Sequence, residues 1–457
     1  MSTLNASLAT ALSGLITEQG AIATSTNNVA NVNTPGYSRQ EAELVSSDPA
    51  VVGRLTFGTG VTLQGIESIR DPILESQIQQ QTQAQGQFSS LTSALQQTQT
   101  YFTTSTSDIG TSISNFFNSI NQLSTSPADL SLRQGVLTAA GNLASSLNNT
   151  ANSLTQQQNN LDLSVVSQVS QINQLSQQIA QLNTQISNLE NVAENAGSFI
   201  DQRQQAIDQL SSLVDVTVIP TTENTLTLTT ANGAPLVAGQ QSFQLQTQVT
   251  PSGLHDVYSQ GNDITSQITS GQLGGTLEAR DQQIPAVQTQ LNTLATDLAN
   301  SVNGVQANGF DLNGVAGTNL FNPPSATGAA AALSVAITNP ALIAASSDGS
   351  AGSNGNAQAL YALSTSPIVA GQSPSDYYSG IVFNVGNAAS NASAEQSASS
   401  LVLQQLNDQR GAVSGVSLNE EAANLVQFQD AYSASAQVIT TINDMMNAVI
   451  QMSTLTG

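Results

Sequence analysis

A run of apolar residues at alternating steps of three and four extends through residues 417–457 and constrains the fold more than any other feature. Two rows repeat every seven residues: Leu425, Tyr432, Ile439 and Met446 form one row, and Phe428, Ser435, Ile442 and Val449 form the other. This spacing is typical of a helix that buries a narrow seam against a partner helix, as in a coiled coil. Such a helix cannot bury its seam alone, so the partner must come from this chain or from another.

The other end of the chain supplies a candidate partner. Residues 3–32 are predicted to form a long amphipathic helix. Its first apolar row again repeats every seven residues, at Leu8, Leu15, Ile22 and Val29. Leu12 and Ile16 widen the apolar stripe beyond a two-helix seam, and Pro35-Gly36 ends the helix. We expect both terminal helices to become ordered only when their stripes are covered, since burying one Leu or Ile contributes roughly 1.5–3 kcal/mol.

Between the terminal helices, the period of the apolar residues predicts a helical rod with a small β insertion. Long apolar stripes predict helices at 72–127, 129–151, 161–213, 276–303 and 376–413. Residues 37–70 look extended or loop-like, with short β-like runs. Near Val214 the period changes from 3.6 to 2, and Asn232-Gly233 is typical of a hairpin turn. We expect the β insertion to be closed by Gly274 and Gly275.

The predicted fold class is therefore mainly α with a small inserted β domain. It is an antiparallel rod of long helices with paired N- and C-terminal coiled-coil helices. Residues 1–40 and 414–457 are predicted to form a terminal coiled-coil domain that polymerises. Residues 41–215 and 276–413 are predicted to form the α-helical rod domain, and residues 216–275 the inserted β domain.

Composition excludes several classes of function. The formal net charge is −23, and the 7 basic residues, all of them Arg, face 30 acidic residues. Binding to nucleic acid or to an anionic membrane surface requires clustered Lys and Arg, so neither partner is expected. The absence of Cys excludes disulfides and thiolate metal sites. No basic segment and apolar core typical of a cleaved signal peptide precedes Arg39, and no apolar run approaches the roughly 20 residues of a membrane span.

The sequence offers no catalytic, cofactor-binding or metal site. The single histidine, His255, falls in a predicted hairpin, and no nearby spacing suggests a partner, so we expect a surface or turn role. No P-loop, nucleophile elbow or zinc-protease motif is present. Glu420 and Glu421 could pass for paired carboxylates, but Ser417 and Glu420 form a capping box, and acidic residues suit the first turn of a helix. Three other acids are expected on a solvated helix face: Asp162, Glu190 and Glu194.

Three stretches carry motifs that point to one family. Residues 27–40 end in Pro-Gly-Tyr-Ser-Arg-Gln, and residues 414–432 contain the pair Glu420-Glu421. The motif positions are Asn31, Thr34, Pro35, Gly36, Tyr37, Arg39, Gln40, Glu420, Glu421, Gln429 and Tyr432. Together with residues 303–321, these stretches resemble the hook-associated protein 1 (FlgK) family of bacterial flagellar axial proteins. Asn419 stands where that family more usually has Asp.

The resemblance implies a structural component of the flagellum that forms the junction between hook and filament and is required for filament assembly. It implies a ring of protomers in a helical lattice, with hook protein and hook-associated protein 3 as neighbours. It also implies export to the cell exterior without a cleaved signal peptide, with a cytosolic chaperone holding the C-terminal helix. The expected assembly seam consists of Leu8, Leu15, Ile22, Val29, Leu425, Phe428, Tyr432, Ile439, Ile442, Met446 and Val449.

Three alternative interpretations remain open from the sequence. The chain could be another flagellar axial protein, such as the hook, the distal rod or hook-associated protein 3, although Pro35–Gln40 and Glu420-Glu421 favour protein 1. An enzyme on an axial scaffold, such as a wall hydrolase, would need paired carboxylates in the insertion, which holds few acids. An unrelated secreted coiled-coil effector would leave the paired terminal motifs unexplained.

Overall fold

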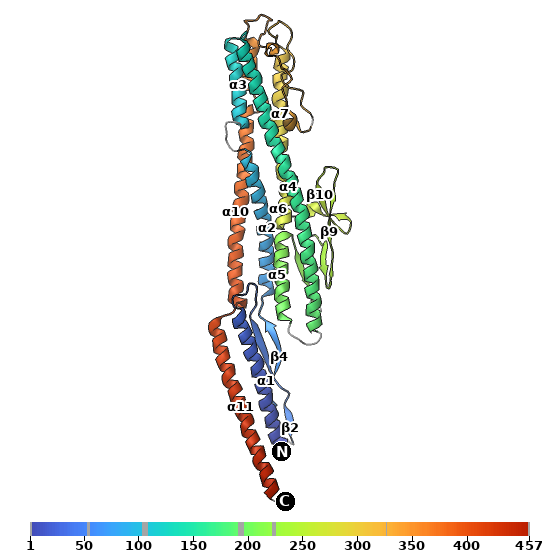
Figure 1. Ribbon diagram of the computed structural model, residues 1–457, viewed down its shortest axis with the longest axis vertical. Helices are drawn as coiled ribbons and strands as arrows, with labels where there is room; N and C mark the ends of the chain where they lie inside the picture. The colour runs from blue at the N-terminus through green and yellow to red at the C-terminus, as the bar shows by residue number, and fades with distance from the viewer. Residues whose placement is uncertain are drawn as a thin grey trace. The chain divides into compact units, whose positions relative to one another are not determined.

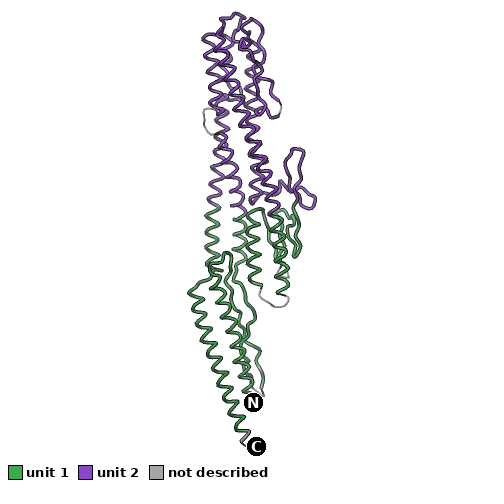
Figure 2. Tube along the Cα trace, in the orientation of Figure 1, with its two compact units in different colours: residues 1–82, 172–245, 399–457 green, residues 83–171, 246–398 purple. Residues whose placement is uncertain are grey.

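The chain divides into two compact units, which Figure 2 shows in different colours. The computed structural model describes residues 2–52, 55–102, 108–190, 196–221, 225–325 and 327–455. The first unit comprises residues 1–82, 172–245 and 399–457, and the second comprises residues 83–171 and 246–398. Both ends of the chain therefore belong to the same unit. Glu194, one of the acids expected on a solvated face, lies outside the described residues.

Helices dominate the described chain, which confirms the mainly α fold class (Figure 1). They are α1 (Ser2–Asn31), α2 (Pro72–Thr100), α3 (Ile109–Thr125), α4 (Leu130–Glu190), α5 (Gly197–Leu213), α6 (Gly271–Glu278), α7 (Ile284–Ala307), α8 (Ala329–Ala332), α9 (Gly355–Ala362), α10 (Pro374–Ser414) and α11 (Leu418–Leu455). A π-helical turn (Ala279–Gln283) joins α6 to α7, and short 3-10 helices span Thr265–Gln267 and Pro340–Leu342.

Several predicted helical stretches have different boundaries in the structure. The stretch 72–127 is two helices, because α2 ends at Thr100 and Asp108 caps a new helix by accepting a 2.6 Å hydrogen bond from the backbone N of Thr111. Conversely, the helices predicted at 129–151 and from 161 are continuous in α4. Residues 152–160 contain neither proline nor glycine, so nothing in the sequence interrupts that helix.

The core of the second unit is formed by α3, α4 and α7 with α9 and the first part of α10. The apolar residues of α3 recur at steps of three and four and are all buried: Ile109, Ile113, Phe116, Phe117, Ile120 and Leu123. The ring of Phe116 lies 5.2 Å from that of Phe117 and 5.8 Å from that of Phe321, centroid to centroid. Arg133 is also buried, and its guanidinium donates to the backbone oxygens of Pro127 and Ile343, each at 2.6 Å.

In the first unit, the segment predicted as extended or loop-like forms a long antiparallel hairpin. Strand β1 (Gln40–Ser46) pairs with β4 (Val61–Ser68), and β2 (Ala50–Val52) pairs with β3 (Leu55–Phe57). A two-stranded hairpin is marginal on its own, and α1 packs against both β1 and β4. The hairpin therefore depends on α1 for its stability.

A four-stranded antiparallel sheet in the first unit follows α5. It contains β5 (Thr217–Pro220), β6 (Leu226–Thr229), β7 (Pro235–Ala238) and β8 (Gln241–Ser242), in that order. The predicted turn at Asn232-Gly233 is confirmed, and Gly233 adopts the positive φ of 86° that favours glycine. The buried side chain of Asn183 on α4 donates to the backbone oxygens of Leu226 and Gly239, which fixes the sheet on the helix.

A three-stranded sheet follows, formed by β9 (Leu245–Val249), β10 (His255–Ser259) and β11 (Asn262–Asp263). His255 is not a free turn residue, because its Nδ1 lies 2.6 Å from Oδ2 of Asp162 on α4. Asp162 is only 5% exposed, so its prediction as a solvated acid is wrong. The buried Arg280 donates to Oδ1 of Asp162 at 2.8 Å and to the backbone oxygen of His255 at 2.6 Å. These contacts fix β10 against α4.

The prediction that Gly274 and Gly275 close the β domain is wrong, because both lie inside α6. Gly275 packs directly against α2, where a Cβ atom on this residue would overlap the backbone oxygen of Gln87. The glycine pair therefore permits a close approach of two helices rather than a turn.

Within the described residues, no helix has the length and apolar character needed to cross a membrane.

Candidate assembly site at the joined chain termini

The two terminal helices, α1 and α11, lie side by side (Figure 1). At Gly14 the two helices approach closely, because a Cβ atom there would lie 3.2 Å from Oγ of Ser435 on α11. Ala11 and Ala21 of α1 are also buried. Another face of α1 covers the hairpin, where the Thr17 hydroxyl donates to the backbone oxygen of Val61 at 3.1 Å. Helix α1 is thus held between α11 and the β1–β4 hairpin.

The residues of the expected assembly seam differ in their exposure. Leu8, Leu15, Ile22 and Val29 of α1 are half-buried. On α11, Ile442 is 3% exposed and fully enclosed, whereas Tyr432 and Val449 are each 36% exposed. The remaining seam residues of α11 are half-buried: Leu425, Phe428, Ile439 and Met446. Within one protein chain the seam is therefore only partly covered.

Apolar side chains remain exposed on both helices. On α1, Leu12 is 49% exposed and Ile16 is 58% exposed. The exposed apolar residues of α11 are Leu418, Val426, Tyr432, Val438, Met445, Val449, Ile450 and Met452. Exposed apolar residues in this number on one helix pair are typical of an interaction surface.

The N-terminal motif folds as a hydrogen-bonded loop between α1 and β1. The buried Asn28 side chain donates to the backbone oxygen of Gln40 at 2.8 Å and accepts from its backbone N at 2.9 Å. The Tyr37 hydroxyl donates to Oδ1 of Asn28 at 2.8 Å. The Thr34 hydroxyl donates to Oδ1 of Asn31 at 3.1 Å, so the polar motif residues determine the path of the loop.

Pro35 and Gly36 bring the loop against α5. The Gln205 side chain donates to the backbone oxygen of Pro35. Gly36 has a φ of 75°, and a Cβ atom at this position would overlap the Gln205 side chain. Only glycine satisfies both requirements at position 36.

Arg39 joins the N-terminal motif to the C-terminal motif. Its Nε lies 3.0 Å from Oε1 of Glu421, and its Nη1 lies 2.9 Å from Oε2 of Glu420. Its backbone N donates to the backbone oxygen of Ser414 at 2.8 Å. The expected capping box is only half formed: Ser417 Oγ accepts from the Glu420 backbone N at 3.5 Å, while the Glu420 carboxylate binds Arg39 instead. Gln429, another motif residue, is exposed on α11.

The environment of the two glutamates differs. The side chain of Glu421 is 1% exposed, whereas that of Glu420 is 60% exposed. Glu421 is therefore not a solvated first-turn acid, contrary to the sequence interpretation. A buried carboxylate needs a cation, and Arg39 supplies it.

Further charged residues lie between the motif loop and the helices beneath it. Arg70, just before α2, pairs with Asp201 of α5, and Asp201 also accepts from the backbone N of Ser38 at 3.3 Å. Arg410 of α10 lies 3.5 Å from Oδ2 of Asp208 and 3.9 Å from Oε2 of Glu75. We use the name charged joint for the following set of residues: Arg39, Arg70, Glu75, Asp201, Asp208, Arg410, Glu420 and Glu421. Of these residues, only Arg39, Glu420 and Glu421 stand out in the sequence.

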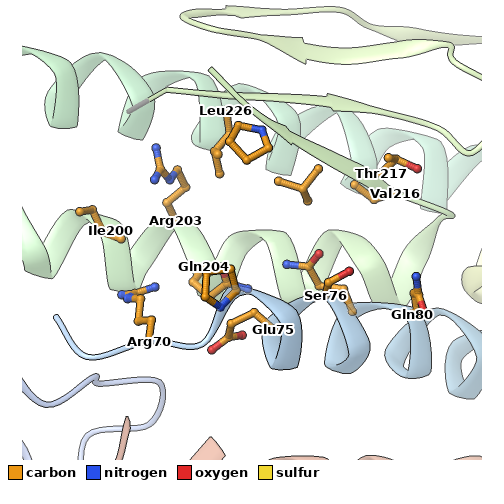
Figure 3. A pocket seen from close by; sticks show the side chains of 14 residues that line it. Arg70, Glu75, Ser76, Gln80, Ile200, Arg203, Gln204, Val216, Thr217 and Leu226 are labelled. Atoms are coloured by element: carbon orange, nitrogen blue, oxygen red, sulfur yellow. The ribbon is translucent and has the colours of Figure 1, made fainter. Parts of the chain in front are cut away.

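Two cavities border the charged joint. One has a volume of about 330 Å³, and its lining includes Arg70, Glu75, Arg203 and Gln204 of α5, and Leu226 of β6 (Figure 3). The second has a volume of about 160 Å³ and is lined by Gly36, Tyr37, Ser38, Glu75, Gln204, Gln205, Asp208, Asn407, Arg410, Gly411, Ser414 and Gly415. Glu75 belongs to the walls of both cavities.

Burial changes the protonation equilibria of this region. Burial raises the pKa of the Glu75 carboxyl, and the nearby Asp208 raises it further. Burial also raises the pKa of Asp208 and that of Asp201, although Arg410 and Arg70 oppose the change. Burial and the charges of Asp201 and Glu421 raise the pKa of Tyr37 to about 12. Glu75, Asp201 and Asp208 therefore bind protons more readily than the same carboxyl groups in water.

Known protein families match three parts of the chain. The model described as the "Flagellar hook-associated protein FlgK helical domain" matches residues 95–321. Models described as "Flagellar basal body rod FlgEFG protein C-terminal" and "Flagella basal body rod protein" match residues 409–452 and 8–37. The two rod-protein matches contain the terminal helix pair.

Curated relatives match over nearly the whole length. The chain is 28% identical to flagellar hook-associated protein 1 of Escherichia coli (strain K12), over 97% of this chain and 98% of that protein. It is 30% identical to flagellar hook-associated protein 1 of Bacillus subtilis (strain 168), over 97% of each. The chain belongs to the flagellar hook-associated protein 1 family.

The fold of the chain is similar to that of a solved structure. The chain superposes on "The structure of the flagellar hook junction protein FlgK from Burkholderia pseudomallei" with a TM-score of 0.68 and 20% identity. The match covers 74% of this chain and 100% of that chain. The similarity supports the mainly α fold with a small β region.

Membership of the hook-associated protein 1 family makes the chain a structural component of the bacterial flagellum and not an enzyme. Hook-associated proteins associate with other axial components and with copies of themselves. The curated relatives named above all bear the name hook-associated protein 1, so assignment to the hook, the distal rod or hook-associated protein 3 is not favoured.

Proposed function

We propose that this chain forms the junction between the flagellar hook and the filament, as a ring of copies joined through their terminal helix pairs. The observation that carries the proposal is the partly covered seam of α1 and α11, with Ile442 enclosed and Leu12 and Ile16 exposed. Each apolar side chain that a neighbouring copy covers contributes roughly 1.5–3 kcal/mol. Several such contacts per copy suffice to order a ring around a central axis.

In this proposal the chain works in three parts. Residues 1–40 and 414–457 form the polymerising domain, residues 41–215 and 276–413 form the helical rod, and residues 216–275 form a β domain. The seam residues named above make the contacts between copies. The motif residues Asn31 to Gln40 and Glu420-Glu421 hold the polymerising helices in their correct relative position.

The neighbours of the ring are proposed to be hook protein on one side and hook-associated protein 3 on the other. The name of the structural relative, a flagellar hook junction protein, supports this placement. Export to the cell exterior without a cleaved signal peptide is proposed on the basis of membership of the hook-associated protein 1 family. A cytosolic chaperone is proposed to cover the C-terminal helix beforehand, since the exposed apolar residues of α11 would otherwise promote aggregation.

Deletion of the gene tests the proposed function. The deletion strain should produce hooks without filaments and release flagellin into the medium, and a plasmid copy of the gene should restore filaments. Electron microscopy of the cell surface and immunoblotting of the medium measure both results. Normal filaments on the deletion strain would refute the junction role.

A further inference from the structure

The smaller cavity of the charged joint holds more negative than positive charge. Glu75 reaches it from α2 and Asp208 from α5, and both carboxylates approach the same guanidinium, that of Arg410 on α10. At 3.9 Å and 3.5 Å, neither contact is a short charge-assisted hydrogen bond. Among the described residues, the buried Oε2 of Glu75 has no hydrogen-bond partner, whereas Oδ1 of Asp208 accepts from Nε2 of Gln204 at 2.9 Å. One cation therefore serves both carboxylates, and Glu75 is the less satisfied of the two.

The surrounding charges do not correct this imbalance. Arg70 pairs with Asp201, and Arg39 pairs with Glu420 and Glu421. Within the charged joint, five carboxylates thus face three guanidinium groups. Arg203, which lines the larger cavity with Glu75, donates to Oδ1 of Asn183 at 2.9 Å. Tyr37, whose pKa Asp201 and Glu421 raise, adds no positive charge. Any proton that the joint gains reduces repulsion among its carboxylates.

Two chain segments next to the terminal helices border this cavity. One is the loop between α1 and β1, which contains Gly36 and packs on α5, and the other is the turn from α10 to α11, which contains Gly415. A Cβ atom on Gly415 would overlap the backbone oxygen of Gly411. The glycines in these two segments permit the small backbone rotations that a hinge needs.

We propose that the cavity is a hinge whose closing is coupled to proton uptake by Glu75 and Asp208, so that the protonated joint fixes the terminal helix pair on α2, α5 and α10. With one carboxyl neutral, Arg410 and the remaining carboxylate form a balanced pair. The neutral carboxyl then donates a hydrogen bond inside the cavity. With both carboxylates ionised, their repulsion opens the joint and leaves the terminal pair free to change its angle.

The sign of the pH dependence follows from the burial of the two groups. Their pKa values are raised in the closed joint, so the closed form keeps its proton at a pH where an open, solvated joint has released it. Stability of the closed joint therefore falls as the pH rises through the raised pKa values. It increases as the pH falls toward the ordinary carboxyl range of about 4.

Spin-label distances in the full-length chain test the proposal. Because the protein has no native Cys, Gln209→Cys on α5 and Ala423→Cys on α11, both exposed, place one label on each side of the joint. The distance distribution should narrow as the pH is lowered from about 8 to about 5, above the range of ordinary carboxyl groups. In the Glu75→Gln variant it should be narrow at both pH values, because the glutamine side chain is neutral throughout.

Two further variants make the outcome decisive. Asp208→Asn should repeat the result of Glu75→Gln and replaces it if that variant fails to fold. Glu67→Gln, which neutralises an exposed acid of β4 outside the joint, should keep the pH dependence of the wild type. A distribution that does not change with pH in the wild type, or that changes equally in the Glu75→Gln variant, would overturn the proposal. The measurement uses the isolated chain, so it is independent of the proposed junction role.

Discussion

Nε of Arg39 lies 3.0 Å from Oε1 of Glu421, although the two residues are 382 positions apart in the sequence. The two residues belong to the N-terminal and the C-terminal motif, and their ion pair joins the start of β1 to the start of α11. The backbone bond from Arg39 to Ser414 strengthens the same connection. The two motifs of the family therefore act as one structural element, which positions the terminal helices.

Removal of the Arg39 guanidinium should loosen the start of α11. Arg39→Gln leaves the buried Glu421 carboxylate without its cation, and a charged hydrogen bond of this kind contributes about 1.5–3 kcal/mol. Amide hydrogen exchange in residues 418–425 should become faster by the factor that corresponds to this loss of free energy. Glu420→Gln is the matched control, since Glu420 is exposed and its pair contributes about 0–1 kcal/mol. Equal effects of the two variants on hydrogen exchange would contradict the conclusion that the buried pair of Arg39 with Glu421 stabilises the start of α11.

Ile442 is the most enclosed apolar residue of α11, and a charge there should separate the terminal helices. Ile442→Asp places an unpaired carboxylate against α1, whose desolvation costs several kcal/mol. Incorporation of the protein at the cell surface should be lost, while the second unit keeps its thermal unfolding transition. Val426→Asp changes a residue that is 60% exposed and should leave the α1–α11 contact intact, as hydrogen exchange in α1 would show.

Gly275 tests the close approach of α6 to α2. Gly275→Ala should lower the free energy of unfolding by about 1–3 kcal/mol, because the added methyl group overlaps the Gln87 backbone. Gly135→Ala on α4 is the control, since that position is exposed and has open space. It should raise the free energy of unfolding by about 0.5–1 kcal/mol. Urea unfolding measures both, and opposite signs are expected.

The terminal helices of the free chain should be more sensitive to protease than the rest. Their seam is only partly covered within one copy, so their local unfolding costs less free energy than unfolding of the second unit's core. Limited proteolysis of the soluble chain should yield a resistant fragment close to residues 40–410. Cleavage inside that range before loss of the ends would show that the terminal pair is stable by itself.

The terminal helices and the family could be predicted from the sequence because they depend on local period and on contiguous motifs. The buried positions of α1 were harder to predict. Buried Ala11 and Ala21 and the glycine opposite Ser435 carry little apolar bulk, so a pattern of large apolar residues selects the half-buried row instead. A helix that contacts a strand pair on a second face has no single apolar stripe.

The charged joint was largely missed for a different reason. Asp201, Glu75 and Arg410 come from three helices, and nothing in their local sequence shows that they meet. The only available signal was scarcity: the chain has seven basic residues, and three of them lie in this joint. Likewise, Asp162 follows a helical pattern that resembles a solvated face, and only the fold shows that His255 and Arg280 cover it.

Immunogold electron microscopy of isolated flagella tests the junction role most directly. Antibodies against residues 246–268 should place gold at a single band between hook and filament, and flagella from an Ile442→Asp strain should lack the band. Gold distributed along the hook or along the filament would contradict the proposed position of the protein.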